Sequence, residues 1–417
     1  MHKIERLLQT LAPKGVEFKT LEEVFEIKNG YTPSKNNPEF WEKGTIPWFR
    51  MEDIRENGRI LKDSIQHITP KALKGKKLFP KNSIIISTTA TIGEHALLIV
   101  DSLANQRFTF LSKKAHCDIA LDMKFFFYQC FLLGEWCKKN TNVSGFASVD
   151  MTAFKKYKFP IPPLEIQQEI VKILDAFTEL NTELNTELKA RKKQYQYYQN
   201  MLLDFKDIHS NHKDAKMSAK TYPKRLQTLL QTLVPKGVEF RKLGEVCDFQ
   251  KGKSITKKAV TFGKVPVISG GRQPAYYHNE ANRSGETIAI SSSGVYAGYV
   301  SYWDIPVFLA DSFSVSPKQK TLMPKYLFHY LTTQQDAIHA TKSIGGIPHV
   351  YSKDLQNFLI PIPPLEIQQE IVKILDQFSI LTTDLLAGIP AEIEARKKQY
   401  EYYREKLLAF KPLQNKA

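Results

Sequence analysis

Apolar residues recur at three- and four-residue steps from Ile166 to Phe205. Steps of this size place them on one face of a helix, and their alternation is typical of a coiled-coil seam containing one insertion of four residues. From Leu164 to Phe205 the pattern predicts a helix of roughly 60 Å, at about 1.5 Å per residue. The predicted seam consists of Ile166, Ile170, Ile173, Phe177, Leu180, Leu184, Leu188, Arg191, Tyr195, Tyr198, Leu202 and Phe205.

The same helical pattern returns later in the chain, because three stretches of sequence occur twice. They are PIPPLEIQQEIVKILD from Pro160 and Pro361, ARKKQY from Ala190 and Ala395, and LLQTL followed by PKGVEF from Leu7 and Leu229. Such echoes identify a tandem duplication. We therefore expect the second copy to form a partner helix, so that the two apolar faces are buried against each other.

The two helical copies differ in their middle sections. Residues 178–189 read TELNTELNTELK, a tetrapeptide repeated three times with one final change, whereas the second copy has no such repeat and is longer there. Gly388 and Pro390 lie in that section and are predicted to break or kink the second helix.

Between the repeated frames, residues 19–159 and 241–360 lose the helical period and carry short strand-like runs divided by turn residues. Strands are predicted at Ser83–Thr89, Leu97–Val100, Phe108–Leu111, Val265–Ile268, Thr287–Ser291 and Tyr299–Tyr302, and helices at 2–11, Met123–Lys138 and Pro324–Thr341. The fold class is therefore α+β, with two globular modules in tandem. The predicted division is 1–159 (first module with its N-terminal helix), 160–206 (central helix), 207–221 (polar linker), 222–360 (second module), 361–411 (distal helix) and 412–417 (tail).

Charge and composition narrow the class of partner. The chain has 59 basic and 43 acidic residues, a formal net charge of +16, and 42% apolar residues. A globular protein with this excess of positive charge is suited to a polyanion, most simply nucleic acid. The few cysteines indicate a reducing compartment, and no apolar run is long enough to span a membrane. We expect a cytoplasmic protein without a signal peptide.

Motifs for catalysis and metal binding are missing. The sequence contains no phosphate-binding GxxxxGK[ST] loop, no GxGxxG opening a helix and no HExxH, and its cysteines and histidines lack metal-ligand spacing. No Asn/Asp-Pro-Pro-Tyr/Phe motif of adenine methyltransferases is present. The sequence therefore predicts a binding protein with no catalytic residues and no metal site.

Both globular modules contain clusters of basic, amide, hydroxyl and aromatic residues, the side chains that contact phosphates and base edges. In the first module the candidates are Lys28, Asn29, Tyr31, Thr32, Ser34, Lys35, Arg50, Lys74, Lys76, Lys77, Thr89, Thr91, Gln106 and Arg107. In the second they are Lys251, Lys253, Ser254, Lys257, Lys258, Arg272, Gln273, Tyr276, Tyr296, His349 and Tyr351. Aromatic residues such as Trp48 are expected in the core.

Over essentially its whole length the chain resembles specificity subunits of type I restriction–modification systems. The resemblance rests on KNGYTPS from Lys28, GTIPW from Gly44, ATIG from Ala90, ANQ from Ala104, PVISGG from Pro266, SGVYAG from Ser293, and the repeated IPPLEIQQEIVKILD. It implies two target-recognition domains held apart by two long antiparallel coiled-coil helices. Each domain would read one half of a split, asymmetric site in double-stranded DNA.

The resemblance also implies the partners and cofactors. The helices would dock two modification (methyltransferase) subunits, which carry S-adenosylmethionine, and ATP-driven restriction/translocase subunits would join them. S-adenosylmethionine, ATP and magnesium are thus expected on partner subunits, with no cofactor bound by this chain. Two alternatives stay open. The chain could be the specificity subunit of a fused methyltransferase–nuclease system, or a structural coiled-coil adaptor that binds only protein.

In some members of the family, tetrapeptide repeats set the length of the gap between half-sites. Helix geometry supports the same role for the repeats of this chain. The predicted spacer residues are Thr178, Glu179, Leu180, Asn181, Thr182, Glu183, Leu184, Asn185, Thr186, Glu187 and Leu188. Four helical residues add about 6 Å and a net rotation of about 40°. One base pair of B-DNA turns by about 34–36°.

Deletion of Thr182–Asn185 is therefore predicted to shorten the gap by one base pair and to leave both half-sites unchanged. The methylated motif of the deletion variant, mapped genome-wide, checks this. An unaltered gap in the variant would contradict it.

Overall fold

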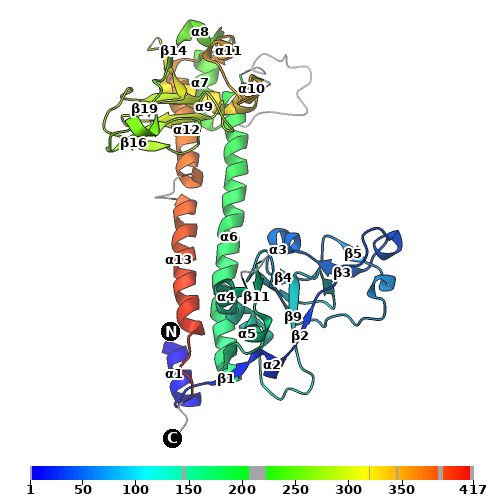
Figure 1. Ribbon diagram of the computed structural model, residues 1–417. Coiled ribbons are helices and arrows are strands. Elements are labelled where there is room, and N and C mark those ends of the chain that lie inside the picture. Colours follow the sequence, from blue (N-terminus) through cyan, green and yellow to red (C-terminus); the bar gives the residue numbers. More distant parts are fainter. Residues whose placement is uncertain are drawn as a thin grey trace. The chain divides into compact units, whose positions relative to one another are not determined.

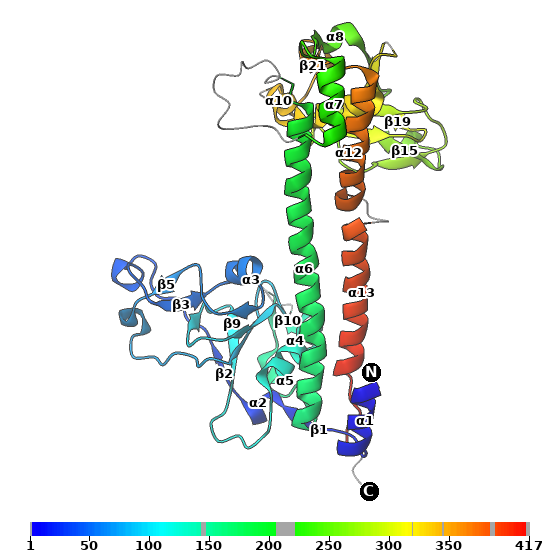
Figure 2. The same ribbon diagram turned by 180° about the vertical axis from the view of Figure 1, so that it is seen from behind.

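The computed structural model of the chain describes residues 2–142, 147–205, 222–318, 320–343, 346–383 and 388–413. The chain forms two compact units, each shown in Figures 1 and 2. The first combines Met1–Glu183 with Glu394–Ala417, and the second comprises Leu184–Ile393. Each unit thus contains one globular module together with helical segments that come from both copies of the repeat. The predicted linker 207–221 and the tail beyond Leu413 lie outside the described residues.

The first module contains a five-stranded sheet and a three-stranded sheet. The larger sheet has the order β2-β9-β6-β7-β4 and the smaller one β5-β3-β8, in which β3 and β8 are parallel. The strands are β2 (Phe25–Asn29), β3 (Ile46–Phe49), β4 (Ile60–Leu61), β5 (His67–Ile68), β6 (Ile84–Ser87), β7 (His95–Leu98), β8 (Leu103–Ala104) and β9 (Phe108–Lys113). The predicted strands at 83–89, 97–100 and 108–111 are confirmed within a few residues.

The second module repeats this plan with a different sequence. Its sheets have the orders β14-β20-β17-β18 and β16-β15-β19, again with a parallel pair, β15 and β19. The strands are β14 (Cys247–Lys251), β15 (Val265–Ile268), β16 (Tyr276–His278), β17 (Thr287–Ser291), β18 (Val300–Trp303), β19 (Phe308–Leu309) and β20 (Ser312–Pro317). Strand for strand, β14 corresponds to β2, β15 to β3, β17 to β6 and β20 to β9.

A helix behind each large sheet supplies much of the core. In the first module this is α4 (Met123–Lys139), whose Phe125 and Phe126 are buried with Phe25 and Phe159. In the second it is α9 (Pro324–Thr333), with Tyr326 and Leu327 fully buried. The single helix predicted over Pro324–Thr341 is wrong: α9 ends at Thr333 and α10 (Gln335–Ala340) follows. The Thr332 and Thr333 hydroxyls donate to carbonyls three residues back and end the first segment.

Shorter elements complete both modules. Around the first are α1 (His2–Leu11), β1 (Glu17–Thr20), α2 (Leu21–Val24), η1 (Pro38–Phe40), α3 (Met51–Asn57), η2 (Pro70–Leu73), β10 (Thr141–Asn142), β11 (Ser148–Val149), α5 (Met151–Lys155) and β12 (Lys158–Ile161). Around the second are α7 (Lys224–Leu233), β13 (Phe240–Lys242), α8 (Leu243–Val246), η4 (Lys257–Ala259), α11 (Ser352–Leu355) and β21 (Leu359–Pro361). The first module is longer partly because α3 and β4 occupy residues 50–66, where the second has only the turn 269–275.

The predicted central helix is α6 (Leu164–Leu203), and the distal one is described as α12 (Leu365–Thr383) and α13 (Gly388–Leu408). The expected break at Gly388 is supported by its backbone conformation, and residues 384–387 before it lie outside the described residues. Gly388 has φ +75° and, with Pro390, opens α13, where a proline costs no helical hydrogen bond.

Each unit pairs an aromatic residue of one repeat with two tyrosines of the other. In the first unit α6 and α13 lie side by side and antiparallel (Figures 1 and 2), and the Phe177 ring centroid lies 6.2 Å from that of Tyr400 and 5.6 Å from that of Tyr403. In the second, Phe378 of α12 lies 6.4 Å from Tyr195 and 5.1 Å from Tyr198 of α6. The expected burial of one copy against the other is confirmed within each unit.

The seam of α6 is only part of what this helix buries. Within the tetrapeptide run Leu184 is buried, Leu180 and Leu188 are half-buried, and Thr182 and Glu183 are exposed, as the pattern predicts. Near its start, however, Gln167 and Leu174 are fully buried, whereas the seam residue Ile173 is only partly covered. Gln167 and Leu174 lie on a second face, which packs against the globular module.

The buried glutamine explains part of the repeated sequence. The Gln167 amide donates to the carbonyls of Ala120 (2.8 Å) and Pro162 (2.6 Å), and its oxygen accepts from the backbone N–H of Asp122 (2.8 Å). Gln368 makes the same set of bonds in the second unit, with the carbonyls of Thr321 and Pro363 and the N–H of Met323. In each copy the following glutamine, Gln168 or Gln369, is exposed.

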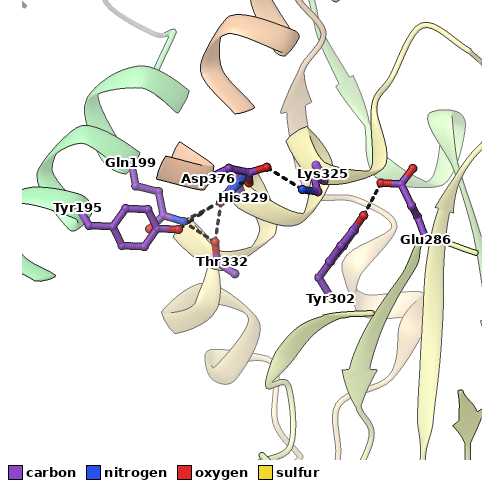
Figure 3. A network of polar contacts seen from close by, with 8 residues as sticks. All are labelled: Tyr195, Gln199, Glu286, Tyr302, Lys325, His329, Thr332 and Asp376. Atoms are coloured by element: carbon purple, nitrogen blue, oxygen red, sulfur yellow. Dashed lines mark hydrogen bonds and ion pairs between the residues drawn. The ribbon is translucent and has the colours of Figure 1, made fainter. Parts of the chain in front are cut away.

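A carboxylate about two turns further along each helix holds the helix to the module. Asp175 accepts from Lys124 (2.6 Å) and from the Tyr128 hydroxyl (2.7 Å). In the second unit Asp376 accepts from Lys325 (2.7 Å) and from Nε2 of His329 (2.9 Å), as Figure 3 shows. Burial alone would raise the pKa of Asp376, but these hydrogen bonds outweigh it and hold the pKa below its ordinary value.

His329 also connects the second module to α6. Its Nδ1 lies 3.4 Å from the Tyr195 hydroxyl, and its backbone carbonyl accepts from the Gln199 amide at 3.2 Å. The Gln199 amide donates to the Thr332 hydroxyl as well (Figure 3). One polar network therefore connects the second module to helices of both repeats, α6 and α12.

Substitution of Gln167 or Gln368 by Leu should destabilise its own unit by about 2–3 kcal/mol, because it leaves buried backbone groups without hydrogen-bond partners. Gln168→Leu and Gln369→Leu are the matched controls on the solvent side and should have little effect. Thermal unfolding followed by circular dichroism compares the four variants. Equal midpoints for Gln167→Leu and Gln168→Leu would contradict the assignment.

Candidate nucleic-acid interface

Four segments of the first module converge on one hollow of about 320 Å³. They are the loop after β2, the residue after β3 together with α3, the turn between β6 and β7, and the turn between β8 and β9. Predicted site residues in its lining are Thr32, Lys35, Arg50, Thr91, Gln106 and Arg107. Residues far apart in the sequence are thus brought together, because neighbouring strands of the two sheets end at the same place.

Gly30 allows the loop after β2 to approach the β8–β9 turn. The Gly30 N–H donates to the Phe108 carbonyl, and the Tyr31 N–H donates to the Ala104 carbonyl. A Cβ atom at residue 30 would lie 2.2 Å from the Asn105 carbonyl oxygen, which no side chain tolerates. The glycine of the KNGYTPS motif is therefore required for the packing that forms the hollow.

Arg50 carries an unused hydrogen-bond donor in this hollow. Its guanidinium lies 5.8 Å from the centre of the Trp48 ring, and the Trp48 indole donates to the Tyr31 carbonyl at 2.9 Å. The Nε of Arg50 is buried and has no hydrogen-bond partner among the described residues; the nearest carboxylate, that of Glu52, lies 3.9 Å away.

Gln106 is held in one orientation at the rim. The Thr32 hydroxyl donates to its side-chain oxygen, which leaves the amide N–H groups of Gln106 directed elsewhere. Arg107 beside it is exposed, and its backbone N–H donates to Asn105 Oδ1 at 3.0 Å. The rim of the hollow therefore presents donors, which match the acceptors of phosphates and of guanine.

The remaining candidates of the first module lie elsewhere. Lys28, Asn29, Tyr31, Lys76 and Lys77 line a second hollow of about 660 Å³. There Lys76 Nζ lies 3.9 Å from the centre of the Tyr31 ring, while Lys28 pairs with Glu26 at 2.9 Å. Lys74 lies over Phe40. Ser34 is exposed, and Thr89 forms a β-bridge with Ser148.

In the second module the corresponding turns gather an arginine and aromatic rings. The Arg272 guanidinium lies 4.9 Å from the centre of the Tyr296 ring and 5.6 Å from that of Tyr299. His349 forms a bridge with Ser293, and its ring lies 6.0 Å from that of Tyr351. The other candidates are exposed: Lys251, Lys253, Ser254, Lys257, Lys258, Gln273 and Tyr276.

The sequence-based reasoning missed Glu52 and Arg55, which line the first hollow from α3. Arg55 lies one helical turn after Met51, and recognising the short helix MEDIREN from its acidic first turn could have identified it. Trp48 lies in the core, as expected, with 3% of its surface exposed.

The described residues contain no group of three or more His, Cys, Asp or Glu side chains suited to a metal ion. Burial raises the pKa of the Cys137 and Cys247 thiols to about 12, so these cysteines are unreactive. No helix in the described part of the chain is long and apolar enough to cross a membrane.

Comparison with known proteins gives consistent matches. A family model described as the type I restriction modification DNA specificity domain matches residues 13–194 and 235–395. The chain is 41% identical over 400 residues to the Escherichia coli protein named type I restriction enzyme EcoprrI specificity subunit, covering 92% of this chain and 93% of that one. It is 32% identical over 306 residues to the E. coli EcoR124I/EcoR124II specificity subunit, covering 65% and 69%.

Among solved structures, a type I restriction–modification S subunit from M. genitalium aligns with 94% of this chain and 95% of its own. The TM-score is 0.57 and the sequence identity 19%. At this identity the likeness shows a shared fold.

Substitution of Arg272 by Ala is predicted to weaken DNA binding by about tenfold, because an arginine contact to a base edge contributes about 1–3 kcal/mol. Binding by the assembled complex to duplex DNA can be measured by fluorescence anisotropy at several salt concentrations. Arg241→Ala is the control, since Arg241 lies in β13 between Glu239 and Glu245. Equal DNA affinities of the two variants would show that Arg272 does not contribute to DNA binding.

Proposed function

The chain belongs to the type I restriction modification DNA specificity family, and from this premise we propose that it is the DNA-recognition subunit of a type I restriction–modification complex. Each globular module reads one half of a bipartite, asymmetric site in double-stranded DNA. The proposal agrees with the net charge of +16 and with the coverage of both modules by the family model.

The observation that supports this proposal most directly is that both modules have corresponding strands but different residues in the turns between them. The two modules share the order of their common strands, with β4 added in the first. The turn between β8 and β9 carries Asn105, Gln106 and Arg107, whereas the turn between β19 and β20 carries Ala310 and Asp311. Recognition of one base sequence twice would need the same side chains at equivalent turns. Two frameworks with divergent turns suit two different half-sites, since side chains that reach base edges carry the sequence information.

We propose that the helices α6, α12 and α13 hold the half-sites at a fixed separation and bind the partner subunits. The repeated segments supply two equivalent surfaces, which suits two identical modification subunits. Restriction/translocase subunits join that core. S-adenosylmethionine is held by the modification subunits, ATP and magnesium act on partner subunits, and the chain itself contributes no catalytic group. Its place of action is the cytoplasm, where its DNA substrate lies.

The test is co-expression of the chain with its methyltransferase subunit in a host without DNA methylation, followed by genome-wide mapping of modified bases. We expect a split motif with two short specific halves around a fixed gap. A single contiguous methylated motif would contradict recognition by two modules. A stable complex that methylates no site and shows no salt-dependent DNA binding would favour the protein-binding adaptor instead.

A further inference from the structure

Backbone hydrogen bonds show which residues correspond in two turns, the one between β8 and β9 and the one between β19 and β20. In the first module the N–H of Thr88 donates to the Arg107 carbonyl, and that of Gly30 to the next residue, Phe108. In the second, the N–H of Ser292 donates to the Asp311 carbonyl, and that of Gly252 to the next residue, Ser312. Arg107 and Asp311 therefore occupy the same position of the shared framework.

The preceding residues confirm this alignment and locate one insertion. The N–H of Asn105 donates to the Phe49 carbonyl at 3.0 Å, and that of Ala310 donates to the Ile268 carbonyl at 2.8 Å. Asn105 thus corresponds to Ala310. Between Asn105 and Arg107 the first module has Gln106, whereas in the second module Asp311 follows Ala310 directly.

The two modules present opposite hydrogen-bonding character at this position. Arg107 is exposed and can only donate, and it lines a hollow that also contains Lys35 and Arg50. Asp311 is exposed, and as a carboxylate it can only accept. The Ser293 hydroxyl donates to its Oδ2, so the carboxylate is oriented, while no ion pair involving Asp311 is found in the described part of the chain.

Phosphate binding does not explain a carboxylate at this position. DNA phosphates repel it. The turn of Ser293, which holds this carboxylate, also carries Tyr296, and the Arg272 guanidinium lies over the Tyr296 ring. A carboxylate contributes to DNA recognition when it accepts a hydrogen bond from an exocyclic amino group in the major groove, above all from cytosine N4. It also rejects bases that present only acceptors there, because two facing acceptors repel each other.

We propose that Asp311 is a specificity-determining residue of the second module and accepts a hydrogen bond from a base amino group, cytosine N4 or adenine N6. Arg107, at the equivalent position of the first module, donates to a guanine. The same framework position thus reads opposite base-edge chemistry in the two half-sites. This inference rests on the proposed function, because it requires that both modules bind DNA.

The experiment compares methylation motifs of the wild-type chain, Asp311→Asn and Arg107→Ala, each co-expressed with the methyltransferase subunit. Asparagine has the size of aspartate and retains an oxygen for Ser293, but it adds a donor and pairs best with adenine. We expect Asp311→Asn to relax or change one position of one half-site, with discrimination reduced about tenfold. Arg107→Ala should relax a position in the other half-site only.

Asp248→Asn is the matched control. Asp248 lies on β14 of the same module, where Lys318 is 3.9 Å away, and it is not part of the turns. Its motif should equal that of the wild type. An unchanged motif for Asp311→Asn, with methylation as complete as in the wild type, would overturn the proposal and assign Asp311 to holding Ser293.

Two further results separate this inference from the function on which it rests. If the wild-type chain directs no split methylation, the proposed function itself fails. If Asp311→Asn loses methylation at every site, the variant is tested for binding to the half-site of the first module. The variant could still bind the half-site of the first module but lose affinity equally for every sequence offered to the second module. That result would show that Asp311 makes a contact that does not distinguish bases, and it would also overturn the proposal.

Discussion

The structure depends on burial of the apolar faces of its long helices by segments from the opposite copy of the repeat. Phe177 of the first copy packs on Tyr400 and Tyr403 of the second, and Phe378 packs on Tyr195 and Tyr198 of the first. Each module therefore packs against helical segments from both halves of the chain, and the two copies of the repeat are buried together.

Polar contacts give this apolar packing a defined position. The fully buried Gln167 and Gln368 each satisfy backbone groups of their own module, and Asp175 and Asp376 each accept hydrogen bonds from the helix behind the sheet. Apolar surfaces alone permit sliding, whereas directional hydrogen bonds in a buried place allow one arrangement. This explains why the helical frames repeat almost letter for letter while the modules between them differ.

The same division of roles holds inside the modules. Strand pairing places the turns, and backbone hydrogen bonds from Thr88 and Ser292 hold equivalent residues of the two modules in one register. Side chains at those turns make few contacts with the core, so Arg107 and Asp311 can differ without altering the sheets beneath them. A framework that tolerates such exchange at its rim is suited to acquiring new DNA specificities.

The duplication, the positions of most helices and strands, and the seam of the long helix could be predicted from the amino-acid sequence, because they follow from local periodicity and from repeated stretches along the chain. The sequence also identified the basic and aromatic turns as candidate DNA contacts. The folded structure was needed to show which candidates line the same hollow, such as Arg50 and Gln106, and which line another, such as Lys76. It likewise revealed the buried face with Gln167, and the equivalence of Arg107 and Asp311. The physical reason is that these relations arise from pairing between strands distant in sequence, and no periodicity along a single chain encodes which distant turns will be neighbours.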